Sequence, residues 1–236
     1  RYSRFHEVGM AHTLFTNRSG GVSTAPFDSF NLAAHVGDNP ESVENNRRIL
    51  AERIGLPVNS IYFMNQVHGR DVAIIGSDSN YLTSPSVDAL FTTKPGIALV
   101  TLIADCTPLL LTSNRAIAAV HVGRKGLVAG VFQAAVAIFN EHGISNHEIK
   151  AEIGPSICKS CYQVDLDSYR EVVAKIPEAG SSESLRCVDV SGGLQHLLKE
   201  FGISFTLSQE CVAHDEGFFS YRRDVTTGRQ AGVVWL

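Results

Sequence analysis

The chain has 236 residues, of which 44% are hydrophobic and 19% are charged, a balance typical of a globular protein that buries a sizeable core. Its formal net charge of −4 argues against a general polyanion-binding surface, so we expect no nucleic-acid partner. We also expect no membrane partner, because no apolar run approaches the roughly 20 residues of a membrane-spanning helix, and the five dispersed cysteines indicate a reducing, cytoplasmic location.

The first half of the sequence predicts one helix and a series of strands. Asn39 is suited to cap a helix, Pro40 to its first position and Gly55 to its end, so a helix is predicted over 40–54. His68 lies between two strand-like runs, which places it at or near a hairpin bend. Apolar, partly β-branched runs predict strands at 11–16, 61–64, 72–75, 88–93, 97–103, 109–111 and 117–120.

The second half of the sequence mixes helices with strands. Apolar spacing predicts helices at 126–139, 166–176 and 193–201, and strands at 149–153, 203–207 and 231–236. Strands come in clusters rather than in strict alternation with helices, which favours an α+β fold over a regular parallel sheet. No repeat or linker marks a domain boundary, so we predict a single domain over 1–236.

Three predicted strands end in side chains that bind metals. Cys106 lies in a turn between two apolar runs, and His68 and His121 each follow another such run. One thiolate and two imidazoles suit Zn²⁺ and leave one tetrahedral position open, as in a catalytic zinc site. Nothing in the spacing requires the three to meet, so a buried cysteine and two hydrogen-bonded histidines remain the alternative. A metal-free interpretation makes Cys106 a nucleophile, either histidine its base and Asp105 an orienting group.

Cys158 and Cys161 form a CxxC pair in a Gly-Pro loop. No second pair lies at the spacing of a zinc ribbon, because Cys187 and Cys211 are isolated in the sequence. We therefore interpret these cysteines as part of a structured loop in which they pack or line a cavity.

Two pairs of adjacent cationic residues suggest anion recognition. Arg222 and Arg223 lie near the C-terminus, and Arg124 and Lys125 follow His121. Guanidinium groups match phosphate oxygens bidentately, although a solvated surface is the alternative for each pair.

Short motifs spread over nearly the whole chain resemble those of one family. They are, in order, FTNRSGGVS at 15–23, NL at 31–32, HVGD at 35–38, NR at 46–47, QVHG at 66–69, DA at 88–89, ADCTP at 104–108, HVG at 121–123, IGP at 153–155, CY at 161–162, SYRRD at 220–224 and TGR at 227–229. In this order they resemble the laccase-domain (YfiH-like) family, also called the multicopper polyphenol oxidase and purine nucleoside phosphorylase family.

The resemblance implies a fold and a metal site. It implies an α+β domain with a layered, mixed β-sheet core flanked by helices, similar to the catalytic domain of cytotoxic necrotizing factor. It also implies that His68, Cys106 and His121 bind one zinc and are catalytic, with copper as the alternative metal. Asp105 is predicted to orient a metal ligand by contacting that ligand, without binding the metal itself.

The resemblance also implies an activity. Similar proteins phosphorolyse purine nucleosides and methylthioadenosine and deaminate adenosine, so we predict a zinc-dependent purine nucleoside phosphorylase with both additional activities. Its partners are then purine nucleosides and phosphate, and Arg47, Gln66, Arg222 and Arg223 are the predicted substrate-binding residues in a monomer or homodimer. The alternatives are a copper-dependent polyphenol oxidase, a metal-free Cys-His hydrolase or amidase that includes peptidoglycan-precursor editing, and a non-enzymatic zinc fold.

Two positions depart from the family pattern. The family usually has Gly-Trp-Arg-Gly after the second histidine, whereas this chain has Gly123-Arg124-Lys125-Gly126 and lacks an aromatic ring that could stack on a base. Many members carry two adjacent cysteines where this chain has Ser160 and Cys161, which removes one thiol but keeps the predicted metal ligands.

Overall fold

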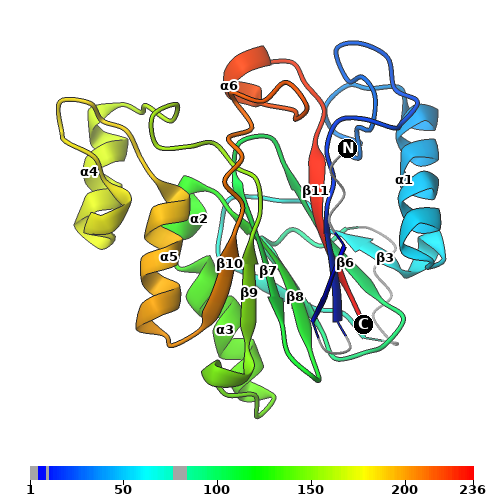
Figure 1. The fold of residues 1–236 in the computed structure, drawn as a ribbon, viewed down its shortest axis with the longest axis horizontal. Coiled ribbons are helices and arrows are strands. Elements are labelled where there is room, and N and C mark those ends of the chain that lie inside the picture. Colours follow the sequence, from blue (N-terminus) through cyan, green and yellow to red (C-terminus); the bar gives the residue numbers. More distant parts are fainter. Residues whose placement is uncertain (1–4, 9–10, 77–83) are drawn as a thin grey trace.

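Two mixed β-sheets form the centre of the computed structural model, which describes residues 5–8, 11–76 and 84–236 (Figure 1). The first sheet has the order β1 (Phe5–Val8), β2 (Ala11–Phe15), β11 (Gln230–Trp235), β6 (Ala98–Ile103) and β3 (Ile61–Phe63). The second sheet has the order β10 (Ser204–Leu207), β9 (Lys150–Ile153), β7 (Thr107–Thr112), β8 (Ile117–Val122), β5 (Ala89–Thr92) and β4 (Val72–Ile74). Within the first sheet β11 runs antiparallel to both β2 and β6, while β3 runs parallel to β6.

The two sheets pack against each other through apolar side chains. Leu99 of β6 and Val234 of β11 meet Leu110 of β7 and Ala119 of β8 in this layer. Every residue of these four strands is buried, because their other faces are covered as well. This explains why the central strands are near-continuous apolar runs in the sequence.

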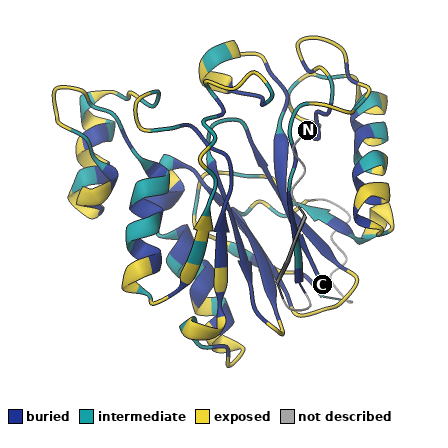
Figure 2. Cartoon of the chain, in the orientation of Figure 1, coloured by how far each residue is buried: buried dark blue, intermediate teal, exposed yellow. Residues whose placement is uncertain are grey.

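Helices cover the outer faces of both sheets. Helix α1 (Pro40–Ile54) packs on the first sheet through Leu50 and Ile54. Helices α2 (Arg124–Ala129), α3 (Val131–Glu141) and α5 (Val190–Glu200) contribute apolar side chains to the cluster on the second sheet, as does α4 (Leu166–Lys175). In Figure 2 the central strands are buried, whereas exposed residues lie on the outer faces of the helices, in the loops and on the edge strand β10. The predicted α+β architecture, a single domain of layered mixed sheets flanked by helices, is thus confirmed.

Local sequence signals account for most helix boundaries. The Asn39 side chain accepts hydrogen bonds from two backbone N–H groups of the first turn of α1, and Gly55 (φ +70°) ends that helix. The helix predicted over 126–139 is two helices, because Gly130 (φ +89°) ends α2 and α3 starts anew. Helix α5 begins three residues earlier than predicted, since the Asp189 side chain caps it by accepting the N–H of Gly192 at 2.7 Å.

The prediction of a hairpin around His68 is wrong. Strand β3 pairs with β6 in the first sheet, whereas β4 pairs with β5 in the second. The segment that carries His68 therefore crosses from one sheet to the other. The turn that carries Cys106 makes a similar crossing, from β6 to β7.

The shorter elements are a helix near the C-terminus and three 3₁₀ turns. They are α6 (Tyr221–Asp224), η1 (Val58–Ser60), η2 (Asn146–Glu148) and η3 (Pro177–Ala179). Within the described parts of the chain, every helix is too short or too polar to cross a bilayer.

Candidate functional site

The two crossing segments and the end of β8 bring His68, Cys106 and His121 together. In the β7–β8 register Pro108 lies opposite His121 and Thr107 opposite Val122, so Cys106 is beside the end of β8. One ligand atom from each of the three side chains lies within 4.8 Å of the other two. The imidazole rings of His68 and His121 are 4.8 Å apart between centroids, in an edge-to-face arrangement. Residues separated by 53 positions in the chain thus meet at one point.

Both crossing segments contain a residue in an unusual backbone conformation. His68 has φ +59° and Asp105 has φ +103°, values that are rare for residues other than glycine. Hydrogen bonds hold each segment in place. The His68 N–H donates to Asp88 Oδ1 at 3.0 Å, and the Asp105 carboxylate accepts from Ser220 Oγ at 2.6 Å and from the Arg222 N–H at 2.7 Å. Such strained positions are often part of a functional site.

Asp88 is a fully buried carboxylate that orders both histidines. Its Oδ1 is 2.8 Å from His121 Nδ1, and its Oδ2 accepts backbone N–H groups from Gly69 at 2.6 Å and Val67 at 3.2 Å. In its neutral form, with Nδ1 protonated toward Asp88, His121 would present the lone pair of Nε2 to Cys106. Because its pKa is raised to about 9, the metal-free ring carries a proton on Nε2 at neutral pH, and a metal bound there would replace that proton. The DA motif at 88–89 was the only signal for this residue in the sequence.

The ligand-orienting role predicted for Asp105 belongs geometrically to Asp88. Asp88 contacts His121, whereas both oxygens of Asp105 are bonded to Ser220 and Arg222. Asp105 instead connects the Cys106 turn to the start of α6, so it acts on the backbone around the thiol and on the placement of Arg222.

The charges of these groups follow from their surroundings. Burial alone would raise the pKa of Asp88, but hydrogen bonds from His121 and Gly69 lower it, so Asp88 is a carboxylate at neutral pH. Burial disfavours the His121 imidazolium, yet the neighbouring Cys106 and Asp88 raise the pKa of His121 to about 9. Desolvation and the nearby His121 lower the pKa of His68, so this imidazole is neutral and its lone pair is available.

Gly123 leaves space that the His68 and Cys106 side chains occupy. A Cβ at this position would lie 2.7 Å from His68 Nδ1 and 3.2 Å from Cys106 Sγ. Any larger residue would therefore displace one of the candidate ligands.

The residues fit a bound transition metal. Two imidazoles and a thiol are the donors that zinc prefers, and a carboxylate behind a ligating histidine is a recurrent feature of such sites. The same donor set is used by copper proteins. Three protein donors leave a coordination position for another molecule, and all three side chains line a cavity.

That cavity has a volume of about 650 Å³ and is lined by cationic and aromatic groups. Arg124, Arg222 and Arg229 line it together with Tyr162 and Tyr221. The Arg222 guanidinium donates to the Gln163 carbonyl at 2.9 Å and lies 5.4 Å from the centre of the Tyr162 ring. A volume of this size is typical of pockets for small organic ligands.

The predicted substrate-binding residues divide into two groups. Arg222 and Gln66 line the cavity, and both ends of the Gln66 amide are bonded to the Leu102 backbone at 2.8 Å. Arg47 is absent from the lining, because its guanidinium donates to the Leu32 carbonyl and lies 4.0 Å from the Phe63 ring.

Arg223 is likewise turned away from the cavity. It donates to the carbonyls of Val212 and Phe218 and pairs with Asp224 at 2.8 Å. Its neighbour Arg222 faces the cavity, so the two adjacent arginines serve different parts of the structure.

Several cavity residues were not selected from the sequence although they lie within family-like motifs, and two of them are Arg229 and His35. Arg229 follows Gly228 in the TGR motif, and its guanidinium is held by the carbonyls of Thr227 and Gly228 at 2.9 Å. His35 belongs to the HVGD motif, and burial together with the charges of Arg229 and Arg47 lowers the pKa of His35. Motif membership was thus a signal, but it did not show which side chains face the cavity.

Comparison with known proteins finds relatives over nearly the full chain. Residues 12–236 match the family described as multi-copper polyphenol oxidoreductase laccase. The chain is 44% identical over 238 residues to purine nucleoside phosphorylase ORF3 of Streptomyces griseus, covering 97% of this chain and 96% of that protein. It is 36% identical over 231 residues to purine nucleoside phosphorylase YfiH of Shigella flexneri, covering 94% and 92%. The crystal structure of NMB0706 from Neisseria meningitidis superposes with a TM-score of 0.89 at 32% identity, covering 100% of this chain and 99% of that one.

Proposed function

Because the chain belongs to the multi-copper polyphenol oxidoreductase laccase family, and relatives are named purine nucleoside phosphorylases, we propose that it is a zinc-dependent enzyme of that activity. We include deamination of adenosine and phosphorolysis of methylthioadenosine in the proposal. The observation that carries it is the shared cavity, in which three metal-binding side chains and three arginines line one space.

The arginines provide a site for phosphate. In phosphorolysis a phosphate oxygen forms a bond to the anomeric carbon of ribose while the bond from that carbon to the purine nitrogen breaks. The electron pair of the broken bond stays on the purine, which then takes up a proton. Arg229 is held by two backbone carbonyls and Arg222 by one, so both are already oriented to accept an anion. Arg124 also lines the cavity, and its guanidinium is paired with Glu171 at 2.8 Å.

Two tyrosines provide surfaces for the purine base. Tyr162 and Tyr221 both line the cavity, and their rings can take the place of the tryptophan that the family usually has near Arg124. Burial and the neighbouring Cys106 raise the pKa of Tyr162, so its hydroxyl keeps its proton and can donate a hydrogen bond.

His68, Cys106 and His121 are the residues that would hold the metal. Bound there, a zinc ion would supply a Lewis acid in the cavity wall. The chain's own contribution is to keep these donors in place: Asp88 fixes the His121 ring, and Gly123 leaves room for the His68 ring. Because His121 and Asp88 are almost completely buried, water cannot compete for their hydrogen bond.

Product analysis with adenosine tests the proposal. Zinc-loaded protein is incubated with adenosine, with and without phosphate, and adenine and inosine are followed by chromatography. We expect adenine only when phosphate is present, and inosine also without phosphate. Methylthioadenosine with phosphate should release adenine. Absence of all three reactions would refute the proposal, and Cys106→Ser should lose every activity.

The remaining activity connected with the family's name is tested with the same protein. Copper-loaded protein is assayed with a phenol, and oxygen consumption is measured. Phenol oxidation without any nucleoside turnover would favour the oxidase over the phosphorylase.

A metal-free thiol hydrolase is the second proposal, and one observation favours it. Asp88, His121 and Cys106 form a chain of acid, imidazole and thiol, which is the arrangement that activates a nucleophilic cysteine. Hydrolysis of an amide substrate that persists after chelation, and that stops on alkylation of Cys106, would favour this function. Activity that disappears with the metal would exclude it.

A further inference from the structure

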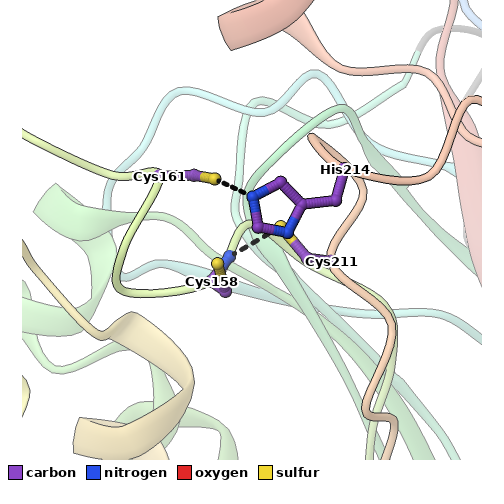
Figure 3. Close-up of side chains that lie close together, drawn as sticks. All are labelled: Cys158, Cys161, Cys211 and His214. Carbon is purple, nitrogen blue, oxygen red and sulfur yellow. Dashed lines mark hydrogen bonds between the residues drawn. The ribbon is translucent and has the colours of Figure 1, made fainter.

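A second set of metal-binding side chains lies where the loops after two neighbouring strands meet (Figure 3). Cys158 and Cys161 come from the loop after β9, and Cys211 and His214 come from the loop after β10. One ligand atom from each residue lies within 4.8 Å of the others. We propose that these four residues, the Cys₃His cluster, form a structural zinc site separate from the site in the cavity.

The topology of the second sheet brings the two loops together. Strands β9 and β10 are parallel neighbours, so their carboxyl ends lie at the same edge of the sheet. The pairing continues past the strands as a bridge between Ser156 and Cys211, with the Val212 N–H donating to the Ser156 carbonyl at 3.2 Å. The backbone N–H of Cys158 donates to Cys211 Sγ at 3.3 Å. The two loops are therefore already joined by backbone contacts before any metal binds.

Each loop presents its two donors from the same kind of turn. The Cys161 N–H donates to the Cys158 carbonyl at 3.0 Å, and the His214 N–H donates to the Cys211 carbonyl at 3.1 Å. The ligand spacing is Cys-x-x-Cys in the first loop and Cys-x-x-His in the second. Two such turns facing each other are the usual construction of a structural zinc site. The interpretation of Cys211 as isolated is wrong, because its local partner is a histidine.

The number and type of donors indicate zinc in a closed site. Three sulfurs and one imidazole satisfy tetrahedral zinc completely and leave no position for substrate. Ligand atoms around one zinc are about 3.5 to 3.8 Å apart, given Zn–S and Zn–N bonds of about 2.3 and 2.05 Å. In this structure Cys161 Sγ and His214 Nε2 are 2.9 Å apart, and the four side chains point toward one another (Figure 3). Side-chain rotations that move the ligand atoms by about 1 Å would therefore complete the site.

The position of the cluster gives the metal a supporting role. Ile157 precedes Cys158, lines the cavity, and donates its N–H to the Asp105 carbonyl at 2.9 Å. Tyr162 follows Cys161 and lines the same cavity. A zinc in the cluster would thus fix the wall of the cavity without contacting substrate.

Metal stoichiometry is the first test. Protein saturated with zinc under reducing conditions and then desalted should contain two zinc ions per chain by mass spectrometry of the metal. Cys211→Ser and Cys161→Ser should each retain one, and Cys106→Ser should also retain one, since it removes only the cavity site. The matched control Cys187→Ser, which changes a cysteine outside both sets, should retain two. A zinc content that stays at the wild-type value in both Cys211→Ser and Cys161→Ser would overturn the proposal. A single zinc in the wild type that Cys211→Ser removes and Cys106→Ser retains would support the cluster and contradict zinc in the cavity site instead.

X-ray absorption at the zinc edge tests the proposal without any substitution. If both sites are filled, the zinc ions have two sulfur ligands on average, because the cluster supplies three and the cavity site supplies one. An average of one sulfur would overturn the proposal, whatever the activity of the enzyme.

The exposed His214 offers a variant that spares the fold. His214→Asn should lose one zinc, keep the circular dichroism spectrum and lower the midpoint of thermal unfolding by several degrees. A variant that unfolds at the wild-type temperature and keeps both zinc ions would contradict a structural role. A disulfide within the cluster that persists under reducing conditions and excludes zinc would also refute it.

Discussion

Replacing Asp88 by asparagine should weaken metal binding at the cavity site, although Asp88 is not itself a candidate ligand. In the wild type both carboxylate oxygens are used, one by His121 and the His68 N–H, the other by the N–H groups of Gly69 and Val67. An asparagine keeps one oxygen, so its NH₂ group must face donors on one of the two sides. At least one charge-assisted hydrogen bond is then lost, which corresponds to about 1.5 to 3 kcal/mol.

The expected result is a metal affinity that falls about 10- to 100-fold, the range found for changes to groups that orient metal ligands. The assay is competition for zinc with a chromophoric chelator, in a Cys211→Ser background so that only the cavity site is measured. Glu152→Gln is the matched control, because Glu152 is also a buried carboxylate but accepts from Thr13, away from the metal site. Equal zinc affinity in wild type and Asp88→Asn would refute the assigned role of Asp88.

Three further outcomes are expected. In metal-free protein, the free energy of unfolding of wild type should exceed that of Asp88→Asn by its full amount above about pH 4. The difference should shrink as the pH falls through the lowered pKa of Asp88, as measured by urea unfolding. A difference that grows in acid would contradict this. Gly123→Ala should lower zinc affinity at least about 10-fold by displacing a ligand, while Gly76→Ala, whose added Cβ would meet no atom of the described residues within 4 Å, should not. Equal affinities would show that the close approach is tolerated. Arg222→Ala should raise the KM for phosphate about 10-fold, the loss of one charge-assisted contact, whereas the exposed Arg48→Ala should leave it unchanged; parallel effects of both variants would indicate a general charge effect.

Local signals in the sequence predicted most elements but not their partners. The cap, first proline and terminal glycine of α1 act within a few residues, so they can be read directly from the chain. The pairing of β3 and β4 depends instead on which sheet each strand joins. The short connection between them looked like a hairpin, yet it spans the two sheets. The sheet that a strand joins depends on contacts with residues far away in the sequence, and the local pattern of apolar residues does not reveal these contacts.

The candidate site was likewise predicted only in part from the sequence. The motifs and the family resemblance indicated His68, Cys106 and His121, and the structure brings their ligand atoms together. Their roles in metal binding and catalysis stay predictions until they are measured. Asp88 could not be selected from spacing, because its importance comes from three backbone N–H groups and one ring that meet only after folding.

The sequence also did not show which arginine side chains face the cavity. Arg222 and Arg223 are adjacent in the chain, but only Arg222 lines the cavity, since Arg223 is held by carbonyls of the preceding loop. Arg229 faces the cavity although nothing distinguishes it locally from Arg47, which does not. Side-chain direction is set by the surrounding backbone, which the sequence alone does not describe.

The position of β11 determines when during synthesis the cavity site can form. This strand is late in the sequence, yet it lies in the middle of the first sheet, between β2 and β6. Until residues 230–235 have left the ribosome, β6 lacks one neighbour, and the turn after it, which carries Cys106, has no completed sheet to hold it. A metal site formed by His68, Cys106 and His121 would therefore be complete only after β11 has joined β6 in the first sheet.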